Sequence, residues 1–266
     1  NMKLGLCISL FLAGYLYSCP VVAQSTVAQP KEITIKAMTY NSYSGRQMGI
    51  DKIAEVSNKE NPDIVSLQEI ERNTKINPWD TPKKLSELTG MRYYYFAHAL
   101  DIRSGGDYGN VILSKYPISE EKSIKLNILR KDDYVRSFGY VKVTKEGKEF
   151  YFATAHLDHK YEDALRLKQV DEIRACVEPL ELPIILAGDL NSRRGSATMA
   201  TFQKYFTVNC LSDGAPWTAP APRPTYACDW LIYAPNDAFI VKAYNVCYWA
   251  NEESDHYPVV ATYVIK

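Results

Sequence analysis

The sequence predicts an α/β protein in which helices lie outside mixed β-sheets. Short apolar runs typical of strands are separated in some places by stretches with helical spacing and in others by short turns. This alternation favours parallel and antiparallel neighbours within the same sheets. The chain has 266 residues, 46% hydrophobic and 23% charged, as in ordinary globular proteins. No proline-, glycine- or serine-rich linker divides it, so one domain is expected.

The first half of the chain predicts one helix and several strands. Apolar residues three or four apart indicate a helix over Met48–Asn58, which Asn61–Pro62 stops. Short apolar and β-branched runs indicate the strands. The predicted strands are Ile33–Met38 running on to Tyr40–Asn41, Asp63–Gln68 ending at Glu69, Tyr93–Ala97, and Asn110–Ser114 closed by Pro117.

The second half combines a hairpin, a helix and further strands. Phe138–Val143 and Phe150–Thr154 are joined across Glu146–Gly147, which predicts an antiparallel hairpin. Ala164–Cys176 has the spacing of an amphipathic helix. The remaining predicted strands are Pro183–Ala187 running into Gly188–Asp189, Cys228–Tyr233, Ala238–Val246 and Val259–Val264.

The N-terminal segment has the composition of a secretory signal. A basic start at Lys3, the apolar run Leu4–Leu16 and small residues at the end are its three parts. We therefore expect residues 1–23 to be a signal peptide, residues 24–266 to form one domain, and the protein to be periplasmic or extracellular. Lipid attachment at Cys19 is a less favoured alternative, because bulky and proline neighbours make a poor attachment signal.

Export affects how the six cysteines are interpreted. Four remain outside the leader: Cys176, Cys210, Cys228 and Cys247. In an oxidising compartment they could form two bridges in three connectivities, or stay free. We expect Cys228 to be bridged, without an assigned partner. None has the paired spacing of a zinc site, so metal binding by sulfur is not expected.

The charge of the chain is balanced, with 31 basic and 31 acidic residues. Removing the leader, whose only charge is Lys3, leaves 30 against 31 and a net charge of −1. A protein that holds long nucleic acid by its phosphates carries a basic surface instead. The balance therefore disfavours a nuclease, although a small local basic patch is compatible with it.

Polar side chains follow several of the predicted strands. Asn41, Glu69 and Asp189 come at or directly after apolar runs, where a rigid sheet can hold chemistry at its edge. Asp189 and Asn191 are two apart and can face one ligand, and Asp255–His256 puts a carboxylate beside an imidazole. Each signal alone also fits a turn, a helix cap or a surface loop.

Together these residues lie in seven segments that resemble the endonuclease/exonuclease/phosphatase superfamily, the group of DNase I-like nucleases, neutral sphingomyelinases and inositol polyphosphate phosphatases. The resemblance covers residues 35–261 and implies a four-layer sandwich of two mixed sheets flanked by helices. The segments are Met38–Asn41, Pro62–Glu69, Tyr108–Ser114, Thr154–Asp158, Leu186–Asn191, Cys228–Tyr233 and Ser254–Val259.

The resemblance implies a divalent-cation site made of oxygen ligands. Glu69 is similar to the metal-binding glutamate of the superfamily, with Asn41 assisting it and Asp255 completing or flanking the site. A hard cation such as Mg²⁺ keeps several waters and needs few carboxylates. Mg²⁺ is the expected cofactor, with Mn²⁺ or Ca²⁺ as alternatives.

The resemblance also implies the residues that act on substrate. His256 paired with Asp229 is similar to the acid/base element, and Asp189 would orient or deprotonate the attacking water. Asn191 would hold that water or a phosphoryl oxygen, and His156 would donate to a non-bridging oxygen. Substrate binding is expected of Asn110, His156 and Asn191. The resemblance leaves open which group is the base and which the acid.

The expected function is metal-dependent hydrolysis of a phosphodiester, small or lipid-borne, by in-line attack of activated water. The alternatives are a secreted sugar-nonspecific endonuclease, a phosphomonoesterase, or a binding module without turnover. The partner is thus a phosphoester substrate, with nucleic acid as a second choice, and no protein partner is inferred. Trp230 and Cys228 depart from the common tyrosine and aliphatic residues beside Asp229, which changes the packing behind that carboxylate.

Overall fold

The computed structural model describes residues 31–160, 162–208 and 216–266. Over these residues the chain forms eleven strands, four α-helices and one short 3₁₀-helix. The elements in order are β1 (Thr34–Asn41), η1 (Tyr43–Gly45), α1 (Ile50–Glu60), β2 (Ile64–Arg72), α2 (Thr81–Thr89), β3 (Tyr93–Asp101), β4 (Asp107–Ser114), β5 (Ile118–Leu126), β6 (Arg136–Lys145), β7 (Lys148–His156), α3 (Asp163–Val177), β8 (Ile184–Asp189), α4 (Ala197–Phe202), β9 (Asp229–Ala234), β10 (Phe239–Val246) and β11 (Val259–Ile265).

The strands form two mixed sheets. The six-stranded sheet has the order β10-β11-β1-β2-β4-β3, and the five-stranded sheet has the order β5-β6-β7-β8-β9. In each sheet one central pair is parallel, β1 with β2 and β7 with β8, and the other pairs are antiparallel. Parallel neighbours bring their carboxyl ends to the same edge of a sheet.

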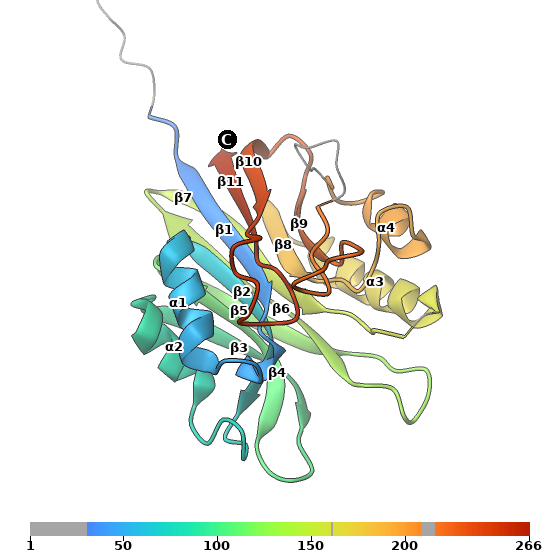
Figure 1. The fold of residues 1–266 in the computed structure, drawn as a ribbon. Helices are drawn as coiled ribbons and strands as arrows, with labels where there is room; N and C mark the ends of the chain where they lie inside the picture. The colour runs from blue at the N-terminus through green and yellow to red at the C-terminus, as the bar shows by residue number, and fades with distance from the viewer. Residues whose placement is uncertain (1–30, 161, 209–215) are drawn as a thin grey trace, which may run out of the picture. The chain divides into compact units, whose positions relative to one another are not determined.

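Two helices cover the outer face of each sheet (Figure 1). One apolar cluster lies between the sheets and joins Ile35 and Ile112 of the first to Phe152 and Leu231 of the second. A second cluster packs α1 and α2 on the six-stranded sheet, and a third packs α3 and α4 on the five-stranded sheet. The predicted four-layer α/β sandwich is therefore confirmed.

Local sequence explains several element boundaries. The hairpin between β6 and β7 turns on Glu146 and Gly147, both with positive φ, as a two-residue turn between twisted strands requires. Helix α1 ends on Asn61 in the left-handed conformation, directly before a proline. The side chain of Ser196 caps the N-terminus of α4. These contacts satisfy backbone groups that the ends of the elements leave unpaired.

The structure adds four elements that the sequence pattern missed, namely the short η1, β5, α2 and α4. Strand β5 is mostly exposed and rich in charged residues, as suits an edge strand, so it lacks the apolar run that marks a buried strand. Helices α2 and α4 have only nine and six residues, too few to display a clear period.

The expectation that Cys228 is bridged is wrong, because Cys228 is a buried free thiol beside Asp229. Cys176 and Cys247 are free as well. Cys210 and the predicted signal peptide, residues 1–23, lie outside the described residues. Within the described ranges, no helix combines the length and the apolar composition needed to cross a bilayer.

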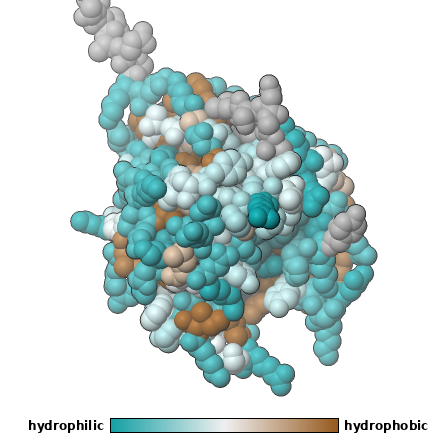
Figure 2. Space-filling model, viewed as in Figure 1, coloured by the Kyte–Doolittle hydropathy of each residue, from teal (hydrophilic) through white to brown (hydrophobic). Residues whose placement is uncertain are grey.

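The surface seen in Figure 2 is mainly hydrophilic, with apolar side chains in small, scattered groups. Such scattering is normal for globular proteins and needs no special explanation.

Candidate active site

The predicted site residues meet at one edge of the two sheets because of strand direction. Asn41 and Glu69 lie at or near the carboxyl ends of the parallel strands β1 and β2. His156 and Asp189 end the parallel strands β7 and β8 and are register partners, and Asp189 is also paired with Asp229 of antiparallel β9. The topology thus brings together residues that are up to 188 positions apart, from Asn41 to Asp229.

A buried polar contact joins the two sheets close to this edge. Ser66 of β2 donates to Thr154 Oγ1 of β7 at 2.7 Å and lies 3.1 Å from the Ala187 carbonyl of β8. The Gln68 amide donates to Ser66 Oγ at 2.6 Å. Buried polar groups with full sets of partners hold elements in one arrangement. The contact therefore fixes the spacing between the strands that carry the site.

Glu69 is aimed into the site by a β-bulge. Its φ is 58°, and the pairing of β2 with β4 shifts register between Leu67 and Ile70. A bulge inserts an extra residue and redirects a side chain. The Ser44 hydroxyl donates to the Glu69 carbonyl at 2.9 Å, and Ser42 donates to the preceding carbonyl. These two contacts hold a backbone conformation that is unfavourable for glutamate.

Asp189 is the centre of the site. Its Oδ1 accepts from the backbone N–H of Asn191 at 2.9 Å, and its Oδ2 accepts from Asn41 Nδ2 at 3.0 Å. The same Asn41 nitrogen lies 3.2 Å from Glu69 Oε1. Burial and the nearby charge of Asp229 raise the pKa of Asp189 to about 6, against the opposing effect of the hydrogen bonds and of a neighbouring histidine.

His256 and Asp229 form a tight pair. His256 Nδ1 lies 2.9 Å from Asp229 Oδ2, and His256 Nε2 lies 3.9 Å from Asp189 Oδ2. Burial opposes a charge on His256, but the carboxylate of Asp229, its hydrogen bond, and the charges of Asp189 and Asp255 outweigh burial. They raise the pKa of His256 to about 10, so the ring is cationic at neutral pH.

His156 is neutral, and its Nδ1 contacts Arg136, a residue that the sequence reasoning missed. Arg136 is 5% exposed, and its guanidinium lies 3.1 Å from His156 Nδ1. Since arginine only donates, Nδ1 accepts, and the proton of the ring is on Nε2. Burial, and next the charge of Arg136, lower the pKa of His156 well below its usual value. His156 Nε2 faces Asp189 Oδ2 at 3.5 Å.

The Arg136 nitrogen that contacts His156, Nη1, also donates to the Tyr108 hydroxyl at 3.0 Å, and Nη2 lies 3.2 Å from His159 Nδ1. The sequence contained one signal for it. Arg136 precedes the apolar run Phe138–Val143. The sequence reasoning searched for polar residues at the carboxyl ends of strands and did not consider those at the amino ends.

Two predicted residues have their side chains outside this cluster. Asn110 is buried, and its amide donates to the carbonyl and lies 3.2 Å from the hydroxyl of Ser137, next to Arg136. Asp255 is next to His256, but its carboxylate lies 3.4 Å from Ser254 Oγ and does not line the cavity. Asn191 lines the cavity, and its side-chain amide donates to the Leu157 carbonyl at 3.0 Å.

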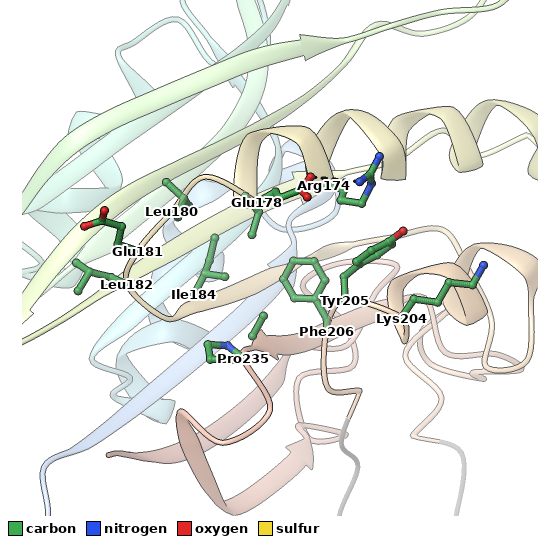
Figure 3. Close-up of a pocket in the computed structure, with 12 residues that line it drawn as sticks. Arg174, Glu178, Leu180, Glu181, Leu182, Ile184, Lys204, Tyr205, Phe206 and Pro235 are labelled. Atoms are coloured by element: carbon green, nitrogen blue, oxygen red, sulfur yellow. Dashed lines mark hydrogen bonds and ion pairs between the residues drawn. The ribbon is translucent and has the colours of Figure 1, made fainter.

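The cluster opens into a cavity of about 800 Å³. Its walls contain Glu69, His156, Asp189 and His256, together with basic side chains that include Arg46, Arg103, Arg136 and His159. A cavity lined by both carboxylates and guanidinium groups suits an anionic ligand held beside a cation. A second hollow of about 490 Å³ lies against α3, β8 and the segment after α4, and none of the predicted site residues lines it (Figure 3).

Residues 38–256 match the sequence model of the Endonuclease/Exonuclease/phosphatase family. The chain belongs to the endonuclease/exonuclease/phosphatase family. Enzymes of this family act on phosphoesters and generally depend on divalent cations. Sphingomyelinase C 1 of Leptospira interrogans is 24% identical over 211 residues, which are 66% of this chain and 35% of that protein. The match therefore spans about a third of the length of that relative.

Two further similarities agree with this assignment. A phospholipase C of Staphylococcus aureus is 24% identical over 235 residues, 76% of this chain and 71% of that protein. The crystal structure of an endonuclease/exonuclease/phosphatase from Beutenbergia cavernae superposes with a TM-score of 0.74 at 22% identity, covering 88% of this chain and 72% of that one. A sphingomyelinase C and a phospholipase C thus share sequence with this chain, and a solved endonuclease/exonuclease/phosphatase shares its fold.

Proposed function

We propose that the chain is an exported, divalent-cation-dependent phosphodiesterase that hydrolyses a lipid-borne or small phosphodiester. The observation that carries the proposal is the pairing of charge states in one cavity. Asp189 has a carboxylate pKa near 6, and His256 beside it is an imidazolium. Groups whose pKa values diverge in one site are suited to serve as base and acid.

We assign the proton transfers to Asp189 and His256, and the stabilisation of developing negative charge to His156. Asp189 orients the attacking water and takes its proton, while His256 gives a proton to the leaving oxygen. Asp229 holds the imidazolium in place through Nδ1. His156 donates its Nε2 hydrogen to a non-bridging oxygen, where negative charge grows in the transition state. The gap of 3.9 Å between His256 Nε2 and Asp189 is too long for a direct hydrogen bond and suits an intervening water or substrate oxygen.

Cation binding is proposed at Glu69. Its carboxylate lines the cavity, and carboxylate oxygens are ligands that Mg²⁺ prefers; the Asn41 amide nitrogen lies 3.2 Å from Glu69 Oε1 and orients that carboxylate. Asn41 would assist, and Asp255 would contribute from the edge. When bound, the cation would neutralise charge on the phosphoryl oxygens. Asn191 donates one amide hydrogen to the Leu157 carbonyl, and its second amide hydrogen would hold water or a phosphoryl oxygen. Asn110 would act on substrate indirectly, by holding Ser137 next to Arg136.

A lipid-borne substrate is favoured by the loop between β5 and β6. Ile128, Leu129 and Tyr134 are exposed on this loop, and Tyr134 also lines the cavity. Apolar side chains beside an active-site cavity can contact acyl chains or a lipid surface. The expectation of export rests on the signal-like composition of residues 1–23.

The proposal is tested on residues 24–266 with a chromogenic phosphodiester and the matching monoester, in Mg²⁺, Mn²⁺, Ca²⁺ or EDTA. Diester cleavage should require the cation and fall about 10²- to 10⁴-fold in Asp189→Asn and in His256→Ala. Asp237→Asn, an exposed carboxylate on the β9–β10 connection, is the matched control. Cleavage of the monoester alone would show a phosphatase instead.

Natural substrates follow in the same assay. Phospholipid and sphingomyelin vesicles are compared with sugar-phosphate diesters and plasmid DNA. Leu129→Ser should slow cleavage in vesicles and leave the soluble chromogenic diester unaffected. Rapid nicking of plasmid without turnover of any lipid or sugar-phosphate diester would reject the proposal in favour of a nuclease.

A further inference from the structure

A buried thiol lies against the acid/base pair. Cys228 Sγ is 3.2 Å from Asp229 Oδ2 and 3.7 Å from His256 Nδ1, and these two atoms are 2.9 Å apart. One thiol, one imidazole nitrogen and one carboxylate oxygen thus form a compact triangle. Asp189 completes a group of four whose ligand atoms all lie within 4.8 Å of one another.

The triangle has the dimensions of a tetrahedral zinc site. Zinc bonds of about 2.3 Å to sulfur and about 2.0–2.2 Å to nitrogen or oxygen put neighbouring ligands roughly 3.3–3.7 Å apart. The three separations need shifts of only a few tenths of an ångström to reach these values. Thiolate, imidazole and carboxylate are also the ligands that zinc takes in proteins, whereas Mg²⁺ avoids sulfur.

The surroundings favour a cation at this point. Asp229 is 1% exposed, and among the residues that the structure describes its Oδ1 has no hydrogen-bond partner. Oδ1 is the other oxygen of the carboxylate whose Oδ2 belongs to the triangle, and a buried oxygen without a partner gains from a cation bound to the same carboxylate. The Thr218 hydroxyl donates to Oδ2 at 2.5 Å and orients the carboxylate from behind. His256 and Asp189 are the members of the group that border the cavity, and Cys228 and Asp229 are buried beside them.

We propose that Cys228, Asp229 and His256, with Asp189 on the cavity side, form a zinc site that switches the enzyme off. This site lies beside the proposed Mg²⁺ site at Glu69, to which Asn41 links Asp189, and its chemistry selects borderline or soft cations. The inhibitory part of the inference rests on the proposed function, while the binding part does not.

Zinc binding and the acid role of His256 exclude each other. Zn²⁺ replaces the thiol proton of Cys228 and the proton between His256 Nδ1 and Asp229, so two protons leave to solvent as one divalent ion enters. With its Nδ1 bound to the metal, the imidazole of His256 cannot become an imidazolium. The ring keeps its Nε2 hydrogen, but giving that hydrogen to the leaving oxygen would leave a zinc-bound imidazolate instead of a neutral imidazole, and Asp189 held at the ion can no longer take a proton from water.

Binding is tested by spectroscopy, without substrate. Co²⁺ is titrated into residues 24–266 in saturating Mg²⁺, and the sulfur-to-cobalt charge-transfer absorption in the near ultraviolet is recorded. The band should appear in the wild type, vanish on addition of Zn²⁺ and be absent from Cys228→Ser. Cys176→Ser and Cys247→Ser are the matched controls and should retain it. No band in the wild type, or a band that survives in Cys228→Ser, would overturn the site.

Inhibition is measured next, as the rate with Zn²⁺ divided by the zinc-free rate of the same variant. Cys228→Ser and Cys228→Val should each need about 10- to 100-fold more Zn²⁺ for half inhibition than the wild type. Two variants of different polarity guard against a fold defect in one, and their circular dichroism is recorded. Equal zinc sensitivity in wild type and both variants would show that zinc acts elsewhere and would refute the switch. If the protein proves to have no phosphodiesterase activity, the cobalt titration still shows whether the metal site exists, because it needs no substrate.

Discussion

Two histidines in one cavity carry different charges because burial disfavours a charge on each ring and only His256 has a carboxylate at its Nδ1. Asp229 faces His256, and Arg136 faces His156. The carboxylate favours an imidazolium, and the guanidinium excludes one. His256 is thereby suited to give a proton and His156 to donate a hydrogen bond without titrating near neutral pH.

Asp229→Asn should move the alkaline limb of the pH–rate profile. In the wild type the rate should rise as Asp189 loses its proton near pH 6 and fall as His256 loses its proton near pH 10. Without the Asp229 carboxylate, burial dominates and lowers the pKa of His256, so the alkaline limb moves toward neutral pH. The profile of kcat is measured from pH 5 to 10.5, with Asp237→Asn as control. An unmoved alkaline limb would contradict the assignment of His256 as acid.

Arg136→Met should lower kcat with little effect on KM. The change removes the donor to His156 Nδ1, so the ring no longer keeps its hydrogen on Nε2, and we expect a loss of about 10- to 100-fold, as for residues that orient catalytic imidazoles. Nitrogen NMR of the histidine rings should show a mixture of tautomers in the variant. Arg136→Lys, which keeps a donor, should recover part of the rate. A higher KM with unchanged tautomers would show instead that Arg136 binds substrate.

At the scale of elements, the site depends on strands that approach closely and end in register. Gly188 precedes Asp189 on β8, where β7 runs alongside. A Cβ on Gly188 would lie 2.0 Å from the carbonyl oxygen of Ala155. Only glycine permits this approach, which sets His156 opposite Asp189.

Gly188→Ala should separate β7 from β8 and destabilise the fold by about 1–3 kcal/mol or more, as overpacking does. Urea unfolding followed by circular dichroism measures the difference. Gly195→Ala is the control, because its Cβ would meet nothing within 4 Å and only its positive φ of 82° is unfavourable. Equal losses in the two variants would show that the contact with Ala155 relaxes without penalty.

At the scale of the whole molecule, the active site lies across two sheets that must keep their spacing. The apolar cluster between them supplies most of the contact, and Ser66 and Thr154 add a polar link near the site. Apolar packing is not directional, whereas the hydrogen bond is.

Ser66→Ala and Thr154→Val should each lower the free energy of unfolding by about 1–3 kcal/mol, because each leaves a buried polar partner unsatisfied. The double variant should lose less than the sum, with a coupling of about 0.5–3 kcal/mol. Urea unfolding of the four proteins gives the cycle. Strict additivity would mean that the two hydroxyls do not interact across the sheets.

The sequence by itself determined the strand pattern, the fold class and the polar residues at strand ends. These features are local, because burial imposes a period on each element and motifs such as Gly188–Asp189–Leu190–Asn191 are contiguous. Strand β5 was missed because its exposed edge position removes that period.

The tertiary structure alone decided which residues meet and what charge they carry. Arg136 contacts His156 from 20 positions away, and Cys228 meets His256 from 28 positions away. Cysteine spacing gave no reason to expect a sulfur ligand, because that rule considers only pairs along the chain, and only the fold shows Cys228 beside His256. A pKa depends on burial and on neighbours in space, and the fold sets both.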